Sequence, residues 1–234
     1  MEGDSLLLWS LLNTSRMLSL KIHILHTLKK SARHILYAFA NLRAATGEVF
    51  LSDEWSDKDI HYPGDSWDEP NTNLFGNFKQ FMLMKRRHRH LKLLLSIGGW
   101  AYSASFDPVV VSPKLRANFV ATAVRFVEDY GLDGLDIDYE YPKNDLQAQG
   151  FLELIRELRL ALDALERRIG AGRFSLTVAA PCGVEHYRKL YLREMDSFLD
   201  FWNLMASFFV MLSLTCCDDS ALGVRLCGKL GFYS

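Results

Sequence analysis

Residues 131–142 read GLDGLDIDYEYP and place four carboxylates, Asp133, Asp136, Asp138 and Glu140, among apolar and aromatic neighbours. If residues 134–140 form a strand, its side chains alternate between two faces. The last three acids then share one face, and the other face carries Leu135, Ile137 and Tyr139. The chain must therefore build a sheet that covers the apolar face and directs the acids to the opposite side.

The segments around this one predict alternating strands and helices. Short apolar runs predict strands at 34–41, 91–97, 134–140, 174–180 and 198–206. Amphipathic spacing predicts helices within 74–90, at 112–130 and at 145–169, and a short helix within 187–195. Ser112 is the expected N-cap of the second helix, and Gly131 and Gly170 are expected to follow two helix ends.

This alternation indicates a parallel sheet with crossover helices, which is either doubly wound or a (β/α)8 barrel. No G-x-G-x-x-G follows any of the predicted strands, so the dinucleotide-binding pattern is absent. In a barrel, the acidic face of 134–140 would line the interior, and Glu140 would lie at the carboxyl end where such enzymes place their chemistry.

Alternate residues on a strand are only roughly 7 Å apart, so like charges on one face raise the pKa of one or more of them. A carboxyl group that keeps its proton can donate it to a leaving oxygen, and Glu140 is the candidate for this role. The alternatives are a solvated acidic strand, a calcium loop and a divalent-metal site. The spacers Ile137 and Tyr139 are strand formers rather than loop residues, and no histidine lies nearby.

Charge, cysteine spacing and apolar runs limit the kinds of binding partner and site that the chain is expected to have. The chain has 234 residues and a formal net charge of −1, which favours neither nucleic acid nor an anionic membrane. Its four cysteines show neither zinc nor disulfide spacing. The apolar run 6–12 follows two acids, unlike a secretory signal, and 201–214 is too short and too polar for a membrane span.

The motifs resemble one known family. D-x-x-D-x-D-x-E over residues 133–140, SIGGW at 96–100, YAFAN at 37–41, HYPGDSWD at 61–68 and FWNLMA at 201–206 are similar to glycoside hydrolase family 18, the chitinases. The resemblance runs from about residue 35 to residue 206. It implies a (β/α)8 barrel, without cofactor or metal, that cleaves β-1,4-linked N-acetylglucosamine with retention. In that family the N-acetyl oxygen of the substrate is the nucleophile.

The resemblance also implies residue roles. Glu140 would be the general acid and then the base, Asp138 would orient the acetamido group, and Asp136 would share a proton with Asp138. Trp100 would stack on a sugar face. The other substrate-binding positions are Gly98, Gly99, Tyr141 and Met205, and the structural motif positions are Asp133, Ser96, Tyr37 and Phe39. The structural alternatives are a packed loop anchor for Trp100, core for Tyr37 and Phe39, and a tight turn for the glycines.

The resemblance stops at Ser207. The family continues its sixth strand as M-x-Y-D, but Met205 and Ala206 are followed by Ser207 and Phe208. We therefore expect a divergent segment at 1–33, a partial barrel domain of five to six of the eight strands at 34–206, and a divergent tail at 207–234 that does not supply the last two strands. The expected origin is a truncated or mis-spliced product or a faulty gene model.

Two functions follow as expectations. The first is a chitin hydrolase, acting outside the cell on chitin or chitooligosaccharides as a monomer, without nucleic-acid or membrane partners. The second is a non-catalytic chitin-binding protein or an inactive fragment, which the missing M-x-Y-D side chains favour and the presence of Glu140 disfavours.

Overall fold

A computed structural model describes residues 33–68, 73–205 and 230–233 of the chain. Its strands are β1 His34–Leu42, β2 Val49–Leu51, β3 Lys92–Gly98, β4 Gly134–Asp138, β5 Ser175–Pro181, β6 Phe201–Met205 and β7 Leu230–Tyr233. Its helices are α2 Gly76–Arg87, α3 Phe106–Val111, α4 Pro113–Tyr130, α5 Asp145–Ile169, α6 Val184–Tyr187 and α7 Leu192–Asp196, with short turns η2 Trp55–Asp59 and η3 Trp100–Ser105.

All described strands belong to one sheet in the order β2-β1-β3-β4-β5-β6-β7. β2 returns antiparallel to β1, and every other neighbouring pair is parallel. The predicted parallel sheet with crossover helices is therefore confirmed. Within the described residues the sheet is open, with β2 at one edge and β7 at the other.

The sheet extends further than expected from the sequence. β7 lies in the segment after Ala206, where no family strand was expected, and pairs in parallel with β6 from Trp202↔Leu230 to Met205↔Tyr233. The segment at 207–234 thus contributes one strand to the described sheet.

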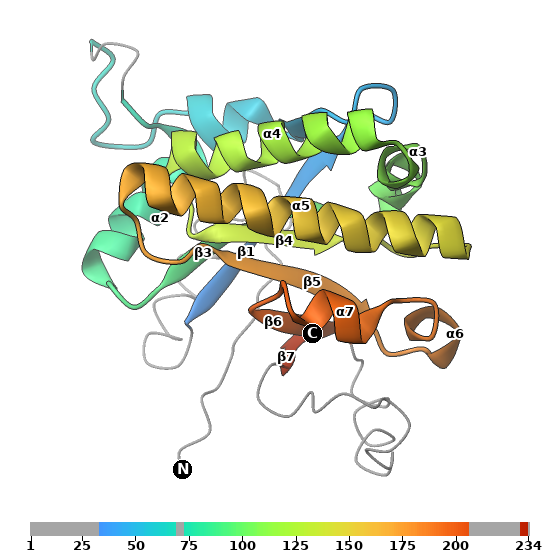
Figure 1. Ribbon diagram of the computed structural model, residues 1–234. Coiled ribbons are helices and arrows are strands. Elements are labelled where there is room, and N and C mark those ends of the chain that lie inside the picture. The colour runs from blue at the N-terminus through green and yellow to red at the C-terminus, as the bar shows by residue number, and fades with distance from the viewer. Residues whose placement is uncertain (1–32, 69–72, 206–229, 234) are drawn as a thin grey trace, which may run out of the picture.

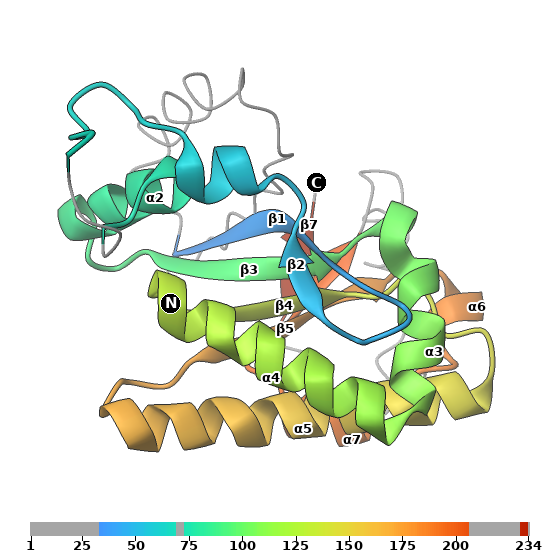
Figure 2. The same ribbon diagram turned by 90° about the horizontal axis from the view of Figure 1, so that it is seen from above.

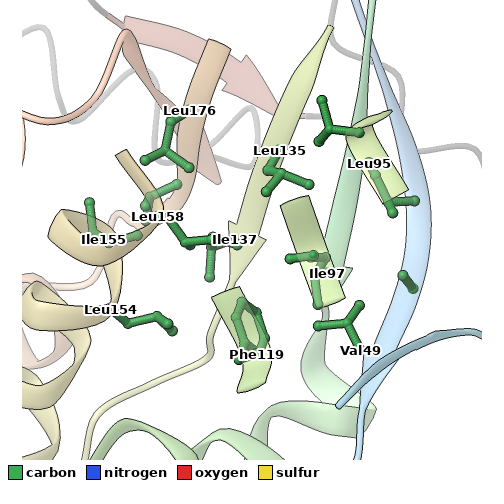
Figure 3. Packing of buried hydrophobic residues seen from close by; sticks show 14 of the residues in the cluster. Val49, Leu95, Ile97, Phe119, Leu135, Ile137, Leu154, Ile155, Leu158 and Leu176 are labelled. Atoms are coloured by element: carbon green, nitrogen blue, oxygen red, sulfur yellow. The ribbon is translucent and has the colours of Figure 1, made fainter. Parts of the chain in front are cut away.

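The core lies between the sheet and its helices. α4 and α5 run side by side across one face of the sheet in both views (Figures 1 and 2). Leu135 and Ile137 of β4 point toward this layer, beside Leu158 of α5 and Phe119 of α4 (Figure 3). Leu135 and Ile137 are 0% exposed and Tyr139 is 2% exposed. The predicted orientation of the apolar face is therefore confirmed.

Several boundaries differ from the predictions. β4 ends at Asp138, two residues before Glu140, and β6 is shorter than the predicted 198–206. Two short helices, α6 and α7, replace the single one predicted within 187–195. β2, η3 and α3 were not predicted, because elements of three to six residues carry too little periodicity to detect.

The helix ends follow the expected backbone chemistry. Gly131 and Gly170 follow α4 and α5 with φ of 60° and 68°, as left-handed caps. Ser112 occupies the N-cap of α4, as predicted, but its side chain makes no capping hydrogen bond.

Some expectations fall on residues outside the described ranges. These are the run 6–12, most of 201–214, and Cys216, Cys217 and Cys227. Cys182 is described and is a free thiol. No helix in the described part of the chain combines the length and the apolar character needed to cross a membrane.

Candidate active site

Asp136 lies at the centre of the sheet, on the face turned away from the helices. The register aligns it with Ser96 of β3 and Thr177 of β5. Its Oδ2 accepts a hydrogen bond of 2.8 Å from Ser96, and its Oδ1 accepts bonds of 2.6 Å from Thr177 and from Asn203 of β6. Side chains from three other strands of the sheet, β3, β5 and β6, therefore hold one fully buried carboxyl group.

Opposing effects act on the Asp136 carboxyl. Burial raises its pKa because a charged carboxylate is poorly solvated there, and this effect outweighs the lowering by its three hydrogen-bond donors. Because those donors occupy both oxygens, the orientation of the carboxyl group is fixed.

Asp138 is the last residue of β4 and is 2% exposed. Burial raises its pKa to about 8, with further contributions from the charges of Asp136 and Glu140 and from a hydrogen bond with Glu140. Its Oδ1 is buried and has no hydrogen-bond partner among the described residues. Asp138 can therefore hold a proton near neutral pH and still offer one oxygen to a ligand.

Glu140 lies just beyond β4 and is partly exposed. Its backbone N–H donates a 2.8 Å hydrogen bond to the hydroxyl of Ser103, and the Tyr141 hydroxyl donates one of 3.1 Å to its Oε2. The Tyr141 ring stacks on His186 at 4.3 Å between centroids. Burial and the Glu140 charge raise the pKa of Tyr141, so its hydroxyl stays a donor.

The glycines after β3 allow close packing beside Asp138. Gly98 has φ of 118°, and a Cβ there would lie 2.2 Å from the Asp138 carbonyl oxygen. Gly99 has φ of 83°, and a Cβ there would lie 3.0 Å from the Phe39 ring. This is the tight turn expected of the pair, and it leads directly to Trp100, whose side chain is 76% exposed. That exposure argues against a packed loop anchor.

Two of the predicted site residues lie away from this group. Tyr37 is in the core, where its hydroxyl donates to Asp57 and accepts a 2.8 Å bond from Asn77. Asp133 precedes β4 at the opposite end of the sheet, where it accepts from the Leu93 N–H and pairs with Lys85. Both residues therefore support the fold. Met205 ends β6, partly exposed, and is paired in register with Pro181.

The sequence analysis missed four residues that contact the acids or their neighbours: Ser103, Thr177, His186 and Asn203. A signal existed for two of them. Thr177 and Asn203 are single polar residues inside apolar strands, and a polar residue in such a strand indicates a buried hydrogen bond. For Ser103 and His186, which lie in or beside short irregular elements, the sequence carries no such signal.

The arrangement suits proton transfer. Two hydrogen-bonded acids, Asp138 and Glu140, lie at the carboxyl end of a parallel strand, near an exposed aromatic ring, and one buried oxygen of Asp138 has no partner among the described residues. Within the described residues, no group of three or more His, Cys, Asp or Glu is arranged to hold a metal ion. A parallel sheet with acids at the carboxyl ends of its strands is the arrangement found in proteins of the (β/α)8-barrel class.

The chain belongs to the glycosyl hydrolases family 18, whose family model matches residues 10–210. It is 42% identical over 177 residues to Endochitinase 1 of Metarhizium anisopliae, a match that covers 75% of this chain and 42% of that protein. The chain thus spans about two fifths of the length of the curated relatives it matches.

Solved structures give the same result. Chitinase ChiA74 from Bacillus thuringiensis superposes with a TM-score of 0.68 at 25% identity, covering 74% of this chain and 35% of that one. The class V chitinase from Nicotiana tobaccum in complex with NAG4 gives 0.62 at 25% identity, covering 76% and 47%. The fold expected from the sequence, an incomplete (β/α)8 barrel, is therefore confirmed.

Proposed function

We propose that this chain hydrolyses β-1,4 linkages between N-acetylglucosamine units of chitin or chitooligosaccharides, with retention and with the substrate's N-acetyl oxygen as the nucleophile. The observation that carries the proposal is the placement of two acids at the carboxyl end of β4: Asp138 ends the strand, buried and with one oxygen that has no partner among the described residues, and the partly exposed Glu140 follows two residues later. Its family membership supports the substrate class.

Glu140 donates the proton to the leaving glycosidic oxygen and later takes one from water. Its position supports this role, because its carboxyl group is partly exposed and is contacted by the Tyr141 hydroxyl. Asp138 is hydrogen-bonded to Glu140 and its own raised pKa lets it hold a proton near neutral pH, so a proton is available beside Glu140.

Asp138 receives the acetamido group in this proposal. Its unpartnered Oδ1 can accept a hydrogen bond from the acetamido N–H, which would direct the acetyl oxygen toward the reacting carbon. Asp136 lies two residues earlier on the same face of β4, and its charge raises the pKa of Asp138 and so helps to keep a proton there. Trp100 offers an exposed ring on which a pyranose can stack.

The test is hydrolysis of a fluorogenic chitooligosaccharide by the full chain, together with a chitin pull-down. Glu140→Gln should reduce turnover by at least about 100-fold, because general acid catalysis is lost, and should spare chitin binding. Glu128→Gln, on the exposed face of α4 where it pairs with Arg168, is the matched control.

Chitin binding with no turnover by the folded wild-type chain would favour the non-catalytic alternative. Absence of both would reject the proposed substrate class. The extracellular location and the monomeric state remain predictions from the family resemblance.

A further inference from the structure

The regular backbone hydrogen bonding between β3 and β4 stops just before Glu140. The last paired residues are Gly98 and Asp138, and one more bond follows, from the Gly99 N–H to the Asp138 carbonyl at 2.9 Å. In a continuing parallel ladder, the next bond would run from the Glu140 N–H to the Gly99 carbonyl.

The Ser103 hydroxyl stands in the place of that bond. It donates to the Gly99 carbonyl at 2.9 Å and accepts from the Glu140 N–H at 2.8 Å. Ser103 is 3% exposed, so both bonds are shielded from water. A hydroxyl has one proton to donate, and since this proton goes to Gly99, the oxygen's lone pairs face Glu140.

The turn after β3 brings the hydroxyl to this place. Gly99 has a left-handed φ and opens η3, and Ser103 follows Gly99 by four residues. A serine in a helical turn readily bonds the carbonyl four residues earlier. The sequence after the glycines thus sends a side chain back into the gap between the two strands.

The inserted hydroxyl explains why β4 ends at Asp138. Two bonds in series hold the Glu140 backbone farther from β3 than a direct ladder bond would, so the carboxyl group of Glu140 projects beyond the strand. We infer that Ser103 is a positioning residue, which sets the distance of Glu140 from β3 and from the turn that carries Trp100. The catalytic consequence of this placement rests on the function proposed above.

Loss of the hydroxyl has two possible outcomes. The Glu140 N–H loses its acceptor, or the ladder closes directly and draws Glu140 toward Gly99. Either outcome displaces the carboxyl group. A misplacement of about 1 Å can cost on the order of 100-fold in rate. Threonine can make the same bond to the carbonyl four residues earlier and should restore the placement.

The experiment compares the full wild-type chain with Ser103→Ala and Ser103→Thr. Ser56→Ala is the matched control, because Ser56 is equally buried and its hydroxyl bonds to Asp53 at 2.6 Å, away from the acids. Three measurements apply: hydrogen exchange of the Glu140 amide, carboxyl titration of Asp138 by NMR, and kcat and KM on a chitooligosaccharide.

For Ser103→Ala we expect roughly tenfold faster hydrogen exchange of the Glu140 amide and a changed pKa of the Asp138 carboxyl group. We also expect kcat to fall by about tenfold to 100-fold, while KM stays within about twofold of wild type. Ser103→Thr should restore amide exchange, the Asp138 pKa and kcat to near their wild-type values. Ser56→Ala should leave all of these quantities unchanged. If Ser103→Ala does not fold, Ser103→Cys, which weakens both bonds at similar volume, replaces it.

Unchanged exchange and titration in the Ser103 variant would overturn the inference, whatever the kinetics. An inactive wild-type chain would instead reject the proposed function, and the two NMR measurements would still decide whether Ser103 positions Glu140.

Discussion

At the residue scale, burial of the Asp138 carboxyl group in the site affects the stability of the fold. A carboxyl group that is 2% exposed, beside two other acids, is poorly suited to carry charge, and its pKa rises to about 8. The unfolded chain has no such environment, so the ordinary value of 3.8 applies there. The same residue therefore links the proposed chemistry to the stability of the protein.

This linkage has a definite sign. Because the folded-state pKa is the higher one, the contribution of Asp138 to stability is complete below about pH 4 and is lost as pH rises toward 8. Asp138→Asn has no carboxylate to bury. Relative to wild type, the free energy of unfolding of this variant should therefore rise between pH 4 and pH 8, by more than about 1 kcal/mol.

Urea unfolding of both proteins at the two pH values measures this difference. Asp129→Asn, which removes a carboxylate from the exposed end of α4, is the matched control. If Asp138→Asn and wild type differ by the same amount at pH 4 and pH 8, burial of this carboxyl group is not what the structure indicates.

The same residues show what the sequence could predict. Alternation placed Leu135, Ile137 and Tyr139 correctly, because side-chain direction on a strand depends only on parity. Nothing local indicated that the Asp136 carboxyl would be bonded by Thr177 and Asn203, since those contacts depend on the order and register of strands far apart in the sequence.

At the element scale, α3 and α5 approach closely at one glycine. A Cβ at Gly150 of α5 would lie 2.2 Å from the Val110 carbonyl oxygen of α3. Elsewhere in a helix, glycine to alanine stabilises by up to about 1 kcal/mol, because alanine loses less entropy on folding. At Gly150 the sign should reverse, since the two helices must separate to admit a methyl group.

Gly150→Ala should therefore lower the free energy of unfolding by about 1–3 kcal/mol in urea titration. Gly172→Ala, where a Cβ would meet nothing within 4 Å, is the matched control and should be neutral or slightly stabilising. Equal effects of the two substitutions would contradict the close packing of α3 on α5.

The first residues of α4 and α5 also show which features the sequence can predict. Asn144 caps α5 by accepting a 3.0 Å bond from the Gln147 N–H, as its residue type favours. Ser112 occupies the equivalent place before α4 without such a bond. Residue type predicted Ser112 as the first cap, but not that its side chain would leave the backbone unbonded while Asn144, which was not predicted as a cap, would bond it.

At the scale of the whole molecule, the two ends of the parallel strands have different tasks. The acids lie at the carboxyl end, and the amino end is held together by ions. Arg159 of α5 is 4% exposed and donates to the Phe174 carbonyl at 2.8 Å, just before β5. It also pairs with Glu166 at 2.8 Å and with Asp200, just before β6, at 3.5 Å. One side chain thus joins the helix layer to two strands.

Arg159→Met should lower the free energy of unfolding by about 3 kcal/mol, because partly buried carboxylates lose their partner and the Phe174 carbonyl loses its donor. For a chain of this size, that corresponds to a melting temperature lower by roughly 6–12 °C. Arg125→Met is the matched control, since Arg125 is exposed on α4 and pairs only with Asp129 among the described residues, an ion pair worth less than about 1 kcal/mol.

Circular dichroism and the fluorescence of the tryptophans, among them the buried Trp202, should record the melt of Arg159→Met at the same lowered temperature, because α5 and the strands share one core. Activity well below the melt should match wild type, since Arg159 lies at the opposite end of the strands from Glu140. If the fluorescence transition moves while the circular dichroism transition does not, Arg159 holds only the region around β6, and the helix layer is anchored by other contacts.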